Sequence, residues 1–228
     1  MKVTIRKHPT DEDWMLCKEA TLATVGKNPV SLPTMEWKKK ILRARHSPIR
    51  MLEFVFSLED IPSWVSVHLV RHVHATPFVR TQRNDRQGNY DRNKAPQDSP
   101  VSMRWLVNAE ELQVIANKRL CTQAAKETRE LVQMICDEVV KVNPEFDGLL
   151  VPMCEHCGGI CYEFEPCGRC DSVRAKVIEI KKDTHTVCIE VPEISYANAG
   201  RILLTQENSN FGTLYYPDGG GDECGDNN

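Results

Sequence analysis

The spacing of hydrophobic residues along the chain predicts five helices and one strand before any chemistry is considered. Apolar positions recur every three or four residues in the helical segments, and each segment has a polar or proline residue near its start. The run Leu52–Leu58 instead alternates and is rich in aromatic residues, which is typical of a half-buried strand. The predicted helices are residues 11–24, 34–45, 62–72, 108–119 and 124–142.

Two further stretches have different patterns. Residues 77–100 are rich in Arg, Asn, Asp, Gln, Gly and Pro, which indicates a long loop. Beyond the cysteine-rich region, four short apolar runs at residues 175–180, 186–191, 202–205 and 213–216 predict a small β appendage. We therefore expect a main domain (residues 1–150), a cysteine-rich segment (151–172), the β appendage (173–217) and a flexible tail (218–228).

Composition narrows the protein class. The 228 residues are 41% hydrophobic and 27% charged, as in an ordinary soluble protein, and 29 Lys plus Arg against 32 Asp plus Glu exclude a broadly basic polyanion binder. No run approaches the roughly 20 apolar residues of a membrane span, and charges interrupt the first 14 residues. We expect a cytoplasmic protein, located in the host cytoplasm if it is viral, with no membrane partner.

The segment from Arg71 to Lys94 concentrates positive charge. It carries six Arg or Lys residues against two Asp residues, although the whole chain is slightly acidic. Arginine presents forked N–H donors that match phosphate oxygens, so one interpretation is a local phosphate site. The other interpretation is a solvated loop whose arginines pair with Asp85, Asp91 and Asp98.

Ten cysteines do not make this a secreted disulfide scaffold, because five of them lie between Cys154 and Cys170. Two Cys-x2-Cys pairs, separated by nine residues, have a spacing able to surround a tetrahedral zinc ion. A reduced packed cluster, or a disulfide formed on isolation, is the alternative. The predicted ligands of a structural zinc are Cys154, Cys157, Cys167 and Cys170.

Several motifs, in the same order along the chain, resemble those of the flavin-dependent thymidylate synthase family. The segment 65–84 resembles the signature R-H-R-x-x-S-x-N-E-x-S-x-R-Y, with Arg71, His72 and Arg83 matching outright and threonines replacing two serines. Residues 45–48 (Arg-His-Ser-Pro) are similar to the turn H-x-[ST]-P, and the segment 92–96 is similar to A-R-x-x-L-P. Residues 107–129 resemble the helix N-x-x-x-L...L-R...A-Q-x-E-I-R, with Arg119 in register. The divergence is typical of a branch often found in bacteriophages.

This resemblance implies a mixed α/β (α+β) fold, with a central sheet flanked by helices, in a homotetramer that binds FAD at subunit junctions. Members of the family transfer the methylene group of methylenetetrahydrofolate to C5 of dUMP, with reduced flavin as hydride donor and NADPH as reductant. The product is dTMP, and no enzyme thiol is needed. A nucleic-acid partner is not expected.

The resemblance also assigns roles to single residues. Arg119 is implied as the catalytic residue, because its family counterpart contacts the pyrimidine and favours an ionised ring nitrogen. The implied substrate contacts are His68, Arg71, Thr81, Gln82, Arg83, Arg92 and Arg119. The implied cofactor contacts are Ser47, Arg71, His72, Asn108 and the backbone of Ala109. Ser47 and Asn108 also have simpler interpretations, as a turn residue and a helix cap.

Departures from the signature leave other functions open. Val73 and Val79 stand where the family has Arg and Glu, so two groups that help to hold cofactor and nucleotide are missing. One alternative is a variant that hydroxymethylates dUMP or dCMP. The others are a nucleotide-binding relative without turnover and a zinc-containing nucleic-acid-binding protein, for which the basic loop and the β appendage are the motivation.

Overall fold

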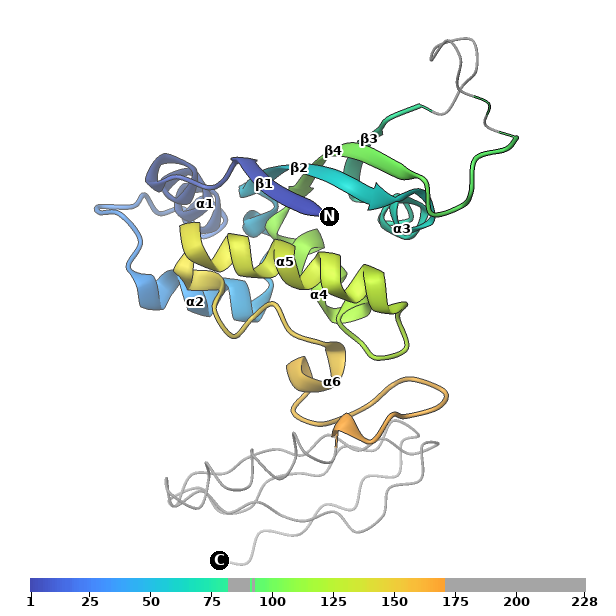
Figure 1. Cartoon of the computed structure of the whole chain (residues 1–228). Coiled ribbons are helices and arrows are strands. Elements are labelled where there is room, and N and C mark those ends of the chain that lie inside the picture. Colours follow the sequence, from blue (N-terminus) through green and yellow to red (C-terminus); the bar gives the residue numbers. More distant parts are fainter. Residues whose placement is uncertain (82–90, 92, 171–228) are drawn as a thin grey trace, which may run out of the picture. The chain divides into compact units, whose positions relative to one another are not determined.

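The computed structural model describes residues 1–81, 91 and 93–170. Residues Met1–Pro152 form one compact unit and a second unit begins at Met153. In the first unit a four-stranded antiparallel sheet has the strand order β1-β2-β4-β3. Figure 1 shows helices α4 and α5 running below this sheet. The predicted mixed α/β fold with a central sheet and flanking helices is confirmed.

Most elements follow one another closely along the chain, and the longest connection lies between β3 and β4. They are β1 (Lys2–Lys7), α1 (Asp11–Ala23), α2 (Met35–Ala44), the 3-10 helix η1 (Ser47–Met51), β2 (Glu53–Pro62), α3 (Ser63–Leu69), β3 (Ala75–Val79), β4 (Pro100–Asn108), α4 (Ala109–Arg119), α5 (Lys126–Val142) and the 3-10 helix η2 (Pro144–Phe146). The second unit contains α6 (Met153–His156).

Side chains near the helix starts explain several of these boundaries. Thr10 and Asp13 form a reciprocal capping box at α1, and the Thr34 side chain accepts from the Trp37 amide at α2. At α4 the Asn108 side chain accepts from the backbone N–H of Glu111 at 2.9 Å. These caps satisfy backbone donors that have no partner inside the helix, so the polar residue before each apolar pattern fixes where the helix begins.

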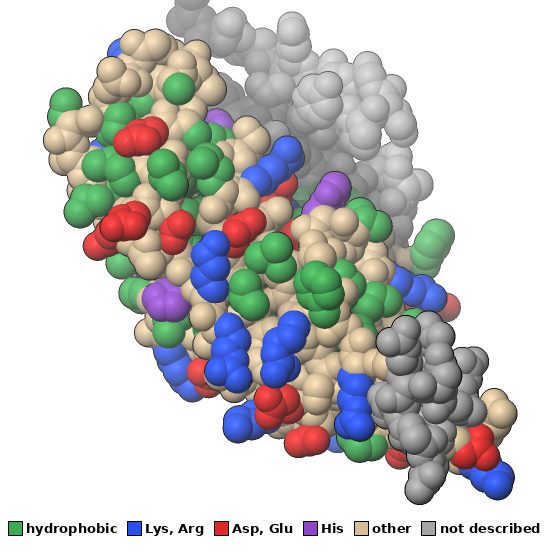
Figure 2. Space-filling model, turned by 90° about the horizontal axis from the view of Figure 1, so that it is seen from above, with side chains coloured by type: hydrophobic (Ala, Val, Ile, Leu, Met, Phe, Trp, Pro, Cys, Tyr) green, Lys and Arg blue, Asp and Glu red, His purple; other side chains and the backbone are tan. Residues whose placement is uncertain are grey.

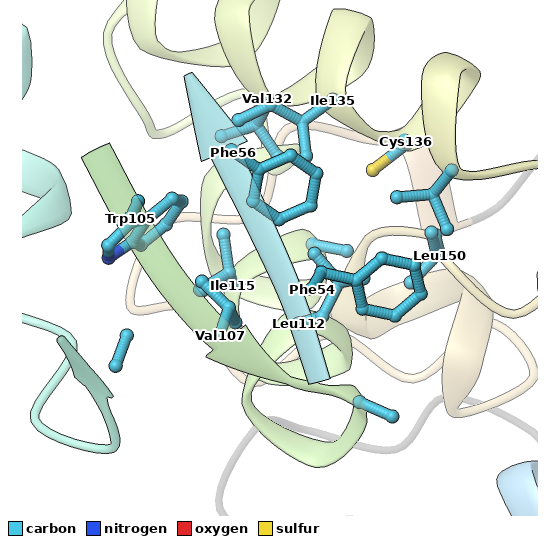
Figure 3. Close-up of a cluster of buried hydrophobic side chains, with 14 of the residues drawn as sticks. Phe54, Phe56, Trp105, Val107, Leu112, Ile115, Val132, Ile135, Cys136 and Leu150 are labelled. Atoms are coloured by element: carbon cyan, nitrogen blue, oxygen red, sulfur yellow. The ribbon is translucent and has the colours of Figure 1, made fainter. Parts of the chain in front are cut away.

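The core lies between one face of the sheet and the helices. Alternate residues of β4, namely Val101, Met103, Trp105 and Val107, are buried, while their neighbours are half-buried or exposed. In Figure 3, side chains of β2 and β4 lie close to side chains of α4 and α5. The labelled members of this cluster are Phe54, Phe56, Trp105, Val107, Leu112, Ile115, Val132, Ile135, Cys136 and Leu150.

The structure corrects three sequence expectations. The helix predicted over 62–72 ends at Leu69, because the chain turns through hydrogen bonds from His72 N to Leu69 O and from Ala75 N to His72 O before it joins the sheet. The strands β1 and β4 were not predicted, and β3 occupies the start of the segment predicted as a loop from residue 77. The four predicted strands and the tail beyond residue 171 lie outside the described residues.

Candidate functional site

Arg119, the last residue of α4, lies at the junction of α3 and α4. Its Nε–H donates to His72 Nε2 at 3.0 Å, and its Nη2 donates to the backbone carbonyl of His68 at 2.9 Å. That carbonyl belongs to the last turn of α3, whose carbonyls lack partners inside the helix and carry partial negative charge. A half-buried guanidinium group is thus held at two points by acceptors from another element.

His72 is buried, and both of its ring nitrogens have partners. Nε2 faces the Nε–H of Arg119, which can only donate, so Nε2 must be the unprotonated acceptor. Nδ1 then carries the proton and donates to Glu111 Oε1 at 3.0 Å. Burial, together with the charge of Arg119, lowers the pKa of His72 below its ordinary value, although Glu111 acts in the opposite direction. The ring is therefore a neutral bridge between a carboxylate and a guanidinium.

Positive charge accumulates around Arg119. Arg71 is exposed, and its charge lowers the pKa of Arg119, for which burial is the larger cause. Within the described part of the chain, no carboxylate forms an ion pair with either arginine, and the hydrogen bonds of Arg119 use two of its five N–H donors. Two guanidinium groups with unused donors are suited to an anionic oxygen ligand such as phosphate or an ionised pyrimidine.

His68 completes the group of predicted residues that the structure brings together. Its Nδ1 lies 2.9 Å from the Thr128 hydroxyl at the start of α5, and its ring packs edge-on against Trp64 with 5.4 Å between the centroids. Burial, with the charges of Arg119 and Arg71, lowers the pKa of His68. His68, Arg71, His72 and Arg119 were predicted to form one site, and here they contact or electrostatically influence one another.

Among the described residues, the others predicted to contact cofactor or substrate are not gathered around Arg119 by any contact that the structure shows. The amide oxygen of Asn108 caps α4, and the backbone N–H of Ala109 donates to Leu52 O at 2.8 Å. Ser47 is exposed at the first position of η1, and Thr81 is exposed after β3. Gln82, Arg83 and Arg92 lie outside the described residues.

A second polar network lies on α4 and was not predicted. Arg45 has a left-handed conformation, with φ 51°, at the end of α2, and its Nε donates to Gln113 Oε1 at 2.9 Å while its Nη2 donates to Asn117 Oδ1. Gln113 and Asn117 are buried, and they also donate to the carbonyls of Leu42 and Val151. Polar residues four positions apart on an otherwise buried helix face were the available sequence signal. Glu111, also missed, shares this helix.

The four predicted zinc ligands are all described residues, but the structure does not gather them into a metal site. No group of three or more His, Cys, Asp or Glu side chains able to hold a metal ion occurs among the residues described. Cys154 lies in α6, where burial raises the pKa of its thiol. The zinc prediction therefore has no support from the described segment 153–170.

Comparisons with known proteins agree with the geometry at the level of the fold. The sequence matches no family model, and no curated protein is significantly similar to it. A flavin-dependent thymidylate synthase from Helicobacter pylori, solved with FAD and dUMP, superposes with a TM-score of 0.53 at 16% identity over 65% of this chain and 99% of its own. A UMP/dUMP methylase from Streptomyces cacaoi, bound to 5-Br dUMP, gives a TM-score of 0.53 at 13% identity over 66% of this chain and 96% of its own.

The chain has the fold of flavin-dependent thymidylate synthases. This agreement rests on the path of the backbone. In the part of the chain that the structure describes, no helix is long and apolar enough to cross a membrane.

Proposed function

We propose that this protein is an FAD-dependent enzyme that transfers a one-carbon unit from methylenetetrahydrofolate to C5 of dUMP, giving dTMP, with NADPH as reductant. The observation that carries the proposal is the fixed guanidinium group of Arg119, held between His72 and the end of α3 with donors to spare. The fold supports it, because solved proteins with this fold bind FAD and dUMP or methylate UMP and dUMP.

Arg119 would act by electrostatic stabilisation. Attack by C5 on the one-carbon unit requires an electron-rich pyrimidine, and C5 is more nucleophilic when the ring nitrogen is ionised and its negative charge is shared with the adjacent carbonyl oxygens. A cation already fixed beside that charge needs no reorganisation during the reaction, and a single well-placed donor of this kind contributes about 3 kcal/mol to a barrier. The two anchoring hydrogen bonds of Arg119 supply the fixed position.

The charge distribution fits an anionic cofactor and an anionic substrate. Arg71 is exposed and lacks a carboxylate partner among the described residues, so its forked donors are available to a phosphate or pyrophosphate group. We propose that Arg71 and Ser47 hold FAD, with Asn108 using the amide group that the helix cap leaves free. His68, Thr81, Gln82, Arg83 and Arg92 would hold dUMP. When bound, the reduced flavin supplies the hydride that completes the methyl group.

The surface favours this local site over binding to a nucleic-acid strand. On the face shown in Figure 2, several basic side chains lie in a row with acidic side chains directly beside them. Carboxylates beside a basic row repel the phosphates of a nucleic-acid strand that would follow it.

The first experiment is an absorbance spectrum of the purified protein with FAD, before and after addition of dUMP or UMP. We expect flavin bands that shift with the nucleotide, and a product whose mass distinguishes a methyl from a hydroxymethyl group. Arg119→Ala should lose activity by about a hundredfold or more, whereas Lys118→Ala, an exposed neighbour on the same helix, should not. A colourless protein that excess FAD leaves unchanged would contradict the proposal.

The oligomeric state and a bound metal are proposed together with the function. A homotetramer with the cofactor at subunit junctions is expected in solution, and sedimentation velocity tests it. A structural zinc held by the cysteine pairs is a separate proposal, which metal analysis of the purified protein decides without reference to activity.

A further inference from the structure

Glu111 is a buried carboxylate for which the proposed reaction has no direct use. Its side chain is about 5% exposed, and its Oε1 lies 3.0 Å from His72 Nδ1. Within the described residues this histidine is the only basic side chain paired with it. Burying a carboxylate is unfavourable unless partners compensate for the lost hydration. A neutral imidazole compensates less than an arginine or lysine would, so a purely stabilising role does not explain Glu111.

We propose that Glu111 is a positioning residue that orients Arg119 through His72, which rests on the proposed role of Arg119. Glu111 accepts the Nδ1–H of His72 and thereby selects the tautomer whose Nε2 lone pair faces Arg119. A carboxylate that fixes the tautomer and ring direction of a histidine is a familiar device in active sites and metal sites. Here the oriented histidine in turn holds the guanidinium group of Arg119.

The chemistry of imidazole makes this link specific. A neutral histidine carries one ring proton, and without an acceptor at Nδ1 nothing keeps the proton there. A proton moved to Nε2 would face the Nε–H of Arg119, so an acceptor would become a donor and the two groups would repel. Arg119 would then keep only its bond to the His68 carbonyl. One remaining hydrogen bond leaves the planar guanidinium free to rotate, which two bonds prevent.

The backbone at the start of α4 holds Glu111 where its side chain can accept from His72. Asn108 caps α4 by accepting from the Glu111 amide, so the third residue of the helix starts from a fixed backbone position. Arg119 lies eight residues later on the same helix, and His72 bridges the two from the turn after α3. The triad Glu111–His72–Arg119 therefore ties the first turn of α4 to its last residue.

The test combines a tautomer measurement with kinetics. Histidine labelled with 15N is examined by NMR in the full chain, and His72→Gln assigns the resonance among the seven histidines. In the unaltered protein we expect a proton on Nδ1 and none on Nε2. Glu111→Leu, which removes the acceptor, should move the proton to Nε2, weaken dUMP binding and lower kcat/KM by roughly tenfold to a hundredfold.

Two variants separate positioning from folding. Glu111→Gln keeps an oxygen acceptor, so it should restore the wild-type tautomer and bring kcat/KM back to within about threefold. Glu110→Gln alters the neighbouring carboxylate, which pairs with Arg50 instead, and should change neither readout. If E111L does not fold, two measurements still test the proposal. They are the tautomer of His72 in the unaltered protein and the kcat/KM of E111Q.

The inference is overturned if His72 carries its proton on Nε2 in the unaltered protein, or if folded E111L keeps the wild-type tautomer and kinetics. Its failure differs from failure of the proposed function. A protein that never turns over dUMP would refute the function, while the His72 signal and its response to E111L would still report whether Glu111 fixes the ring.

Discussion

Replacing Glu145 should destabilise the first unit strongly, because this buried carboxylate ties the start of α1 to the end of α5. Its Oε1 accepts from Trp14 Nε1 at 2.6 Å and from Asn143 Nδ2 at 3.0 Å. The Trp14 side chain is fully buried and Glu145 itself is 2% exposed. Asn143 Nδ2 also donates to the Pro9 carbonyl, so it keeps one partner when Glu145 is removed.

The expected cost follows from these contacts. Glu145→Ala leaves the Trp14 N–H without an acceptor and removes two hydrogen bonds to a charged group. An unsatisfied buried donor costs about 1 to 3 kcal/mol and a hydrogen bond to a charged group contributes about 1.5 to 3 kcal/mol. Because such terms overlap, we expect the free energy of unfolding to fall by about 2 to 4 kcal/mol. In a unit of this size that lowers Tm by about 4 to 16 °C.

Urea denaturation followed by circular dichroism measures the change, with two controls. Glu145→Gln keeps the acceptor oxygen and should restore most of the stability. Glu138→Ala removes a partly exposed carboxylate that pairs with Lys141 on α5, and should leave the free energy of unfolding unchanged within error. A loss for Glu145→Ala below about 0.5 kcal/mol would refute the reasoning, since it would mean that water or another group satisfies Trp14.

Three further outcomes are expected from buried polar groups and thiols. Burial and the charge of Arg119 lower the pKa of His72 below its ordinary value of 6.5. As the pH falls, the unfolded chain therefore binds the proton before the folded protein does, and the free energy of unfolding decreases below about pH 6.5. Urea titrations at several pH values should show this slope, and His72→Gln should flatten it; equal slopes would contradict the prediction. Asn117→Ala removes a fully buried amide that hydrogen-bonds in two directions, and should cost about 2 kcal/mol in the same assay; a neutral effect would show that the network adds nothing. Burial raises the pKa of Cys17 to about 11 and of Cys136 to about 12. Iodoacetamide should therefore leave both thiols unlabelled in the native protein near pH 8 and label both after denaturation, as mass spectrometry can check. Rapid labelling of the native protein would mean that these helices open.

Local patterns along the chain were sufficient for the helices. The predictions over 11–24, 34–45, 108–119 and 124–142 agree with α1, α2, α4 and α5 to within about two residues, because caps and apolar spacing act over a few neighbouring positions. Alternation also predicted β2, although its extension to Pro62 depends on pairing with β4. The alternating residues of β4 carried the same signal and were overlooked.

Sequence motifs also selected four residues that the structure brings together in the candidate site. Arg119, Arg71, His72 and His68 were chosen from spacing and family resemblance, and the fold brings them together between α3 and α4. Their partners could not be read in the same way. Glu111 is an acidic residue in the first turn of a helix, where such residues are common, so its position in the sequence does not mark it as a partner of His72.

The sequence by itself determined where α1, α2, α4 and α5 begin and end, because caps and apolar spacing act over a few neighbouring residues. Only the tertiary structure decided that His72 is a neutral bridge, that the backbone N–H of Ala109 donates to Leu52 O, and that Glu145 accepts from Trp14. Each of these depends on a contact between residues distant in the chain. Such contacts depend on how sheet and helices pack, and no local pattern encodes that packing.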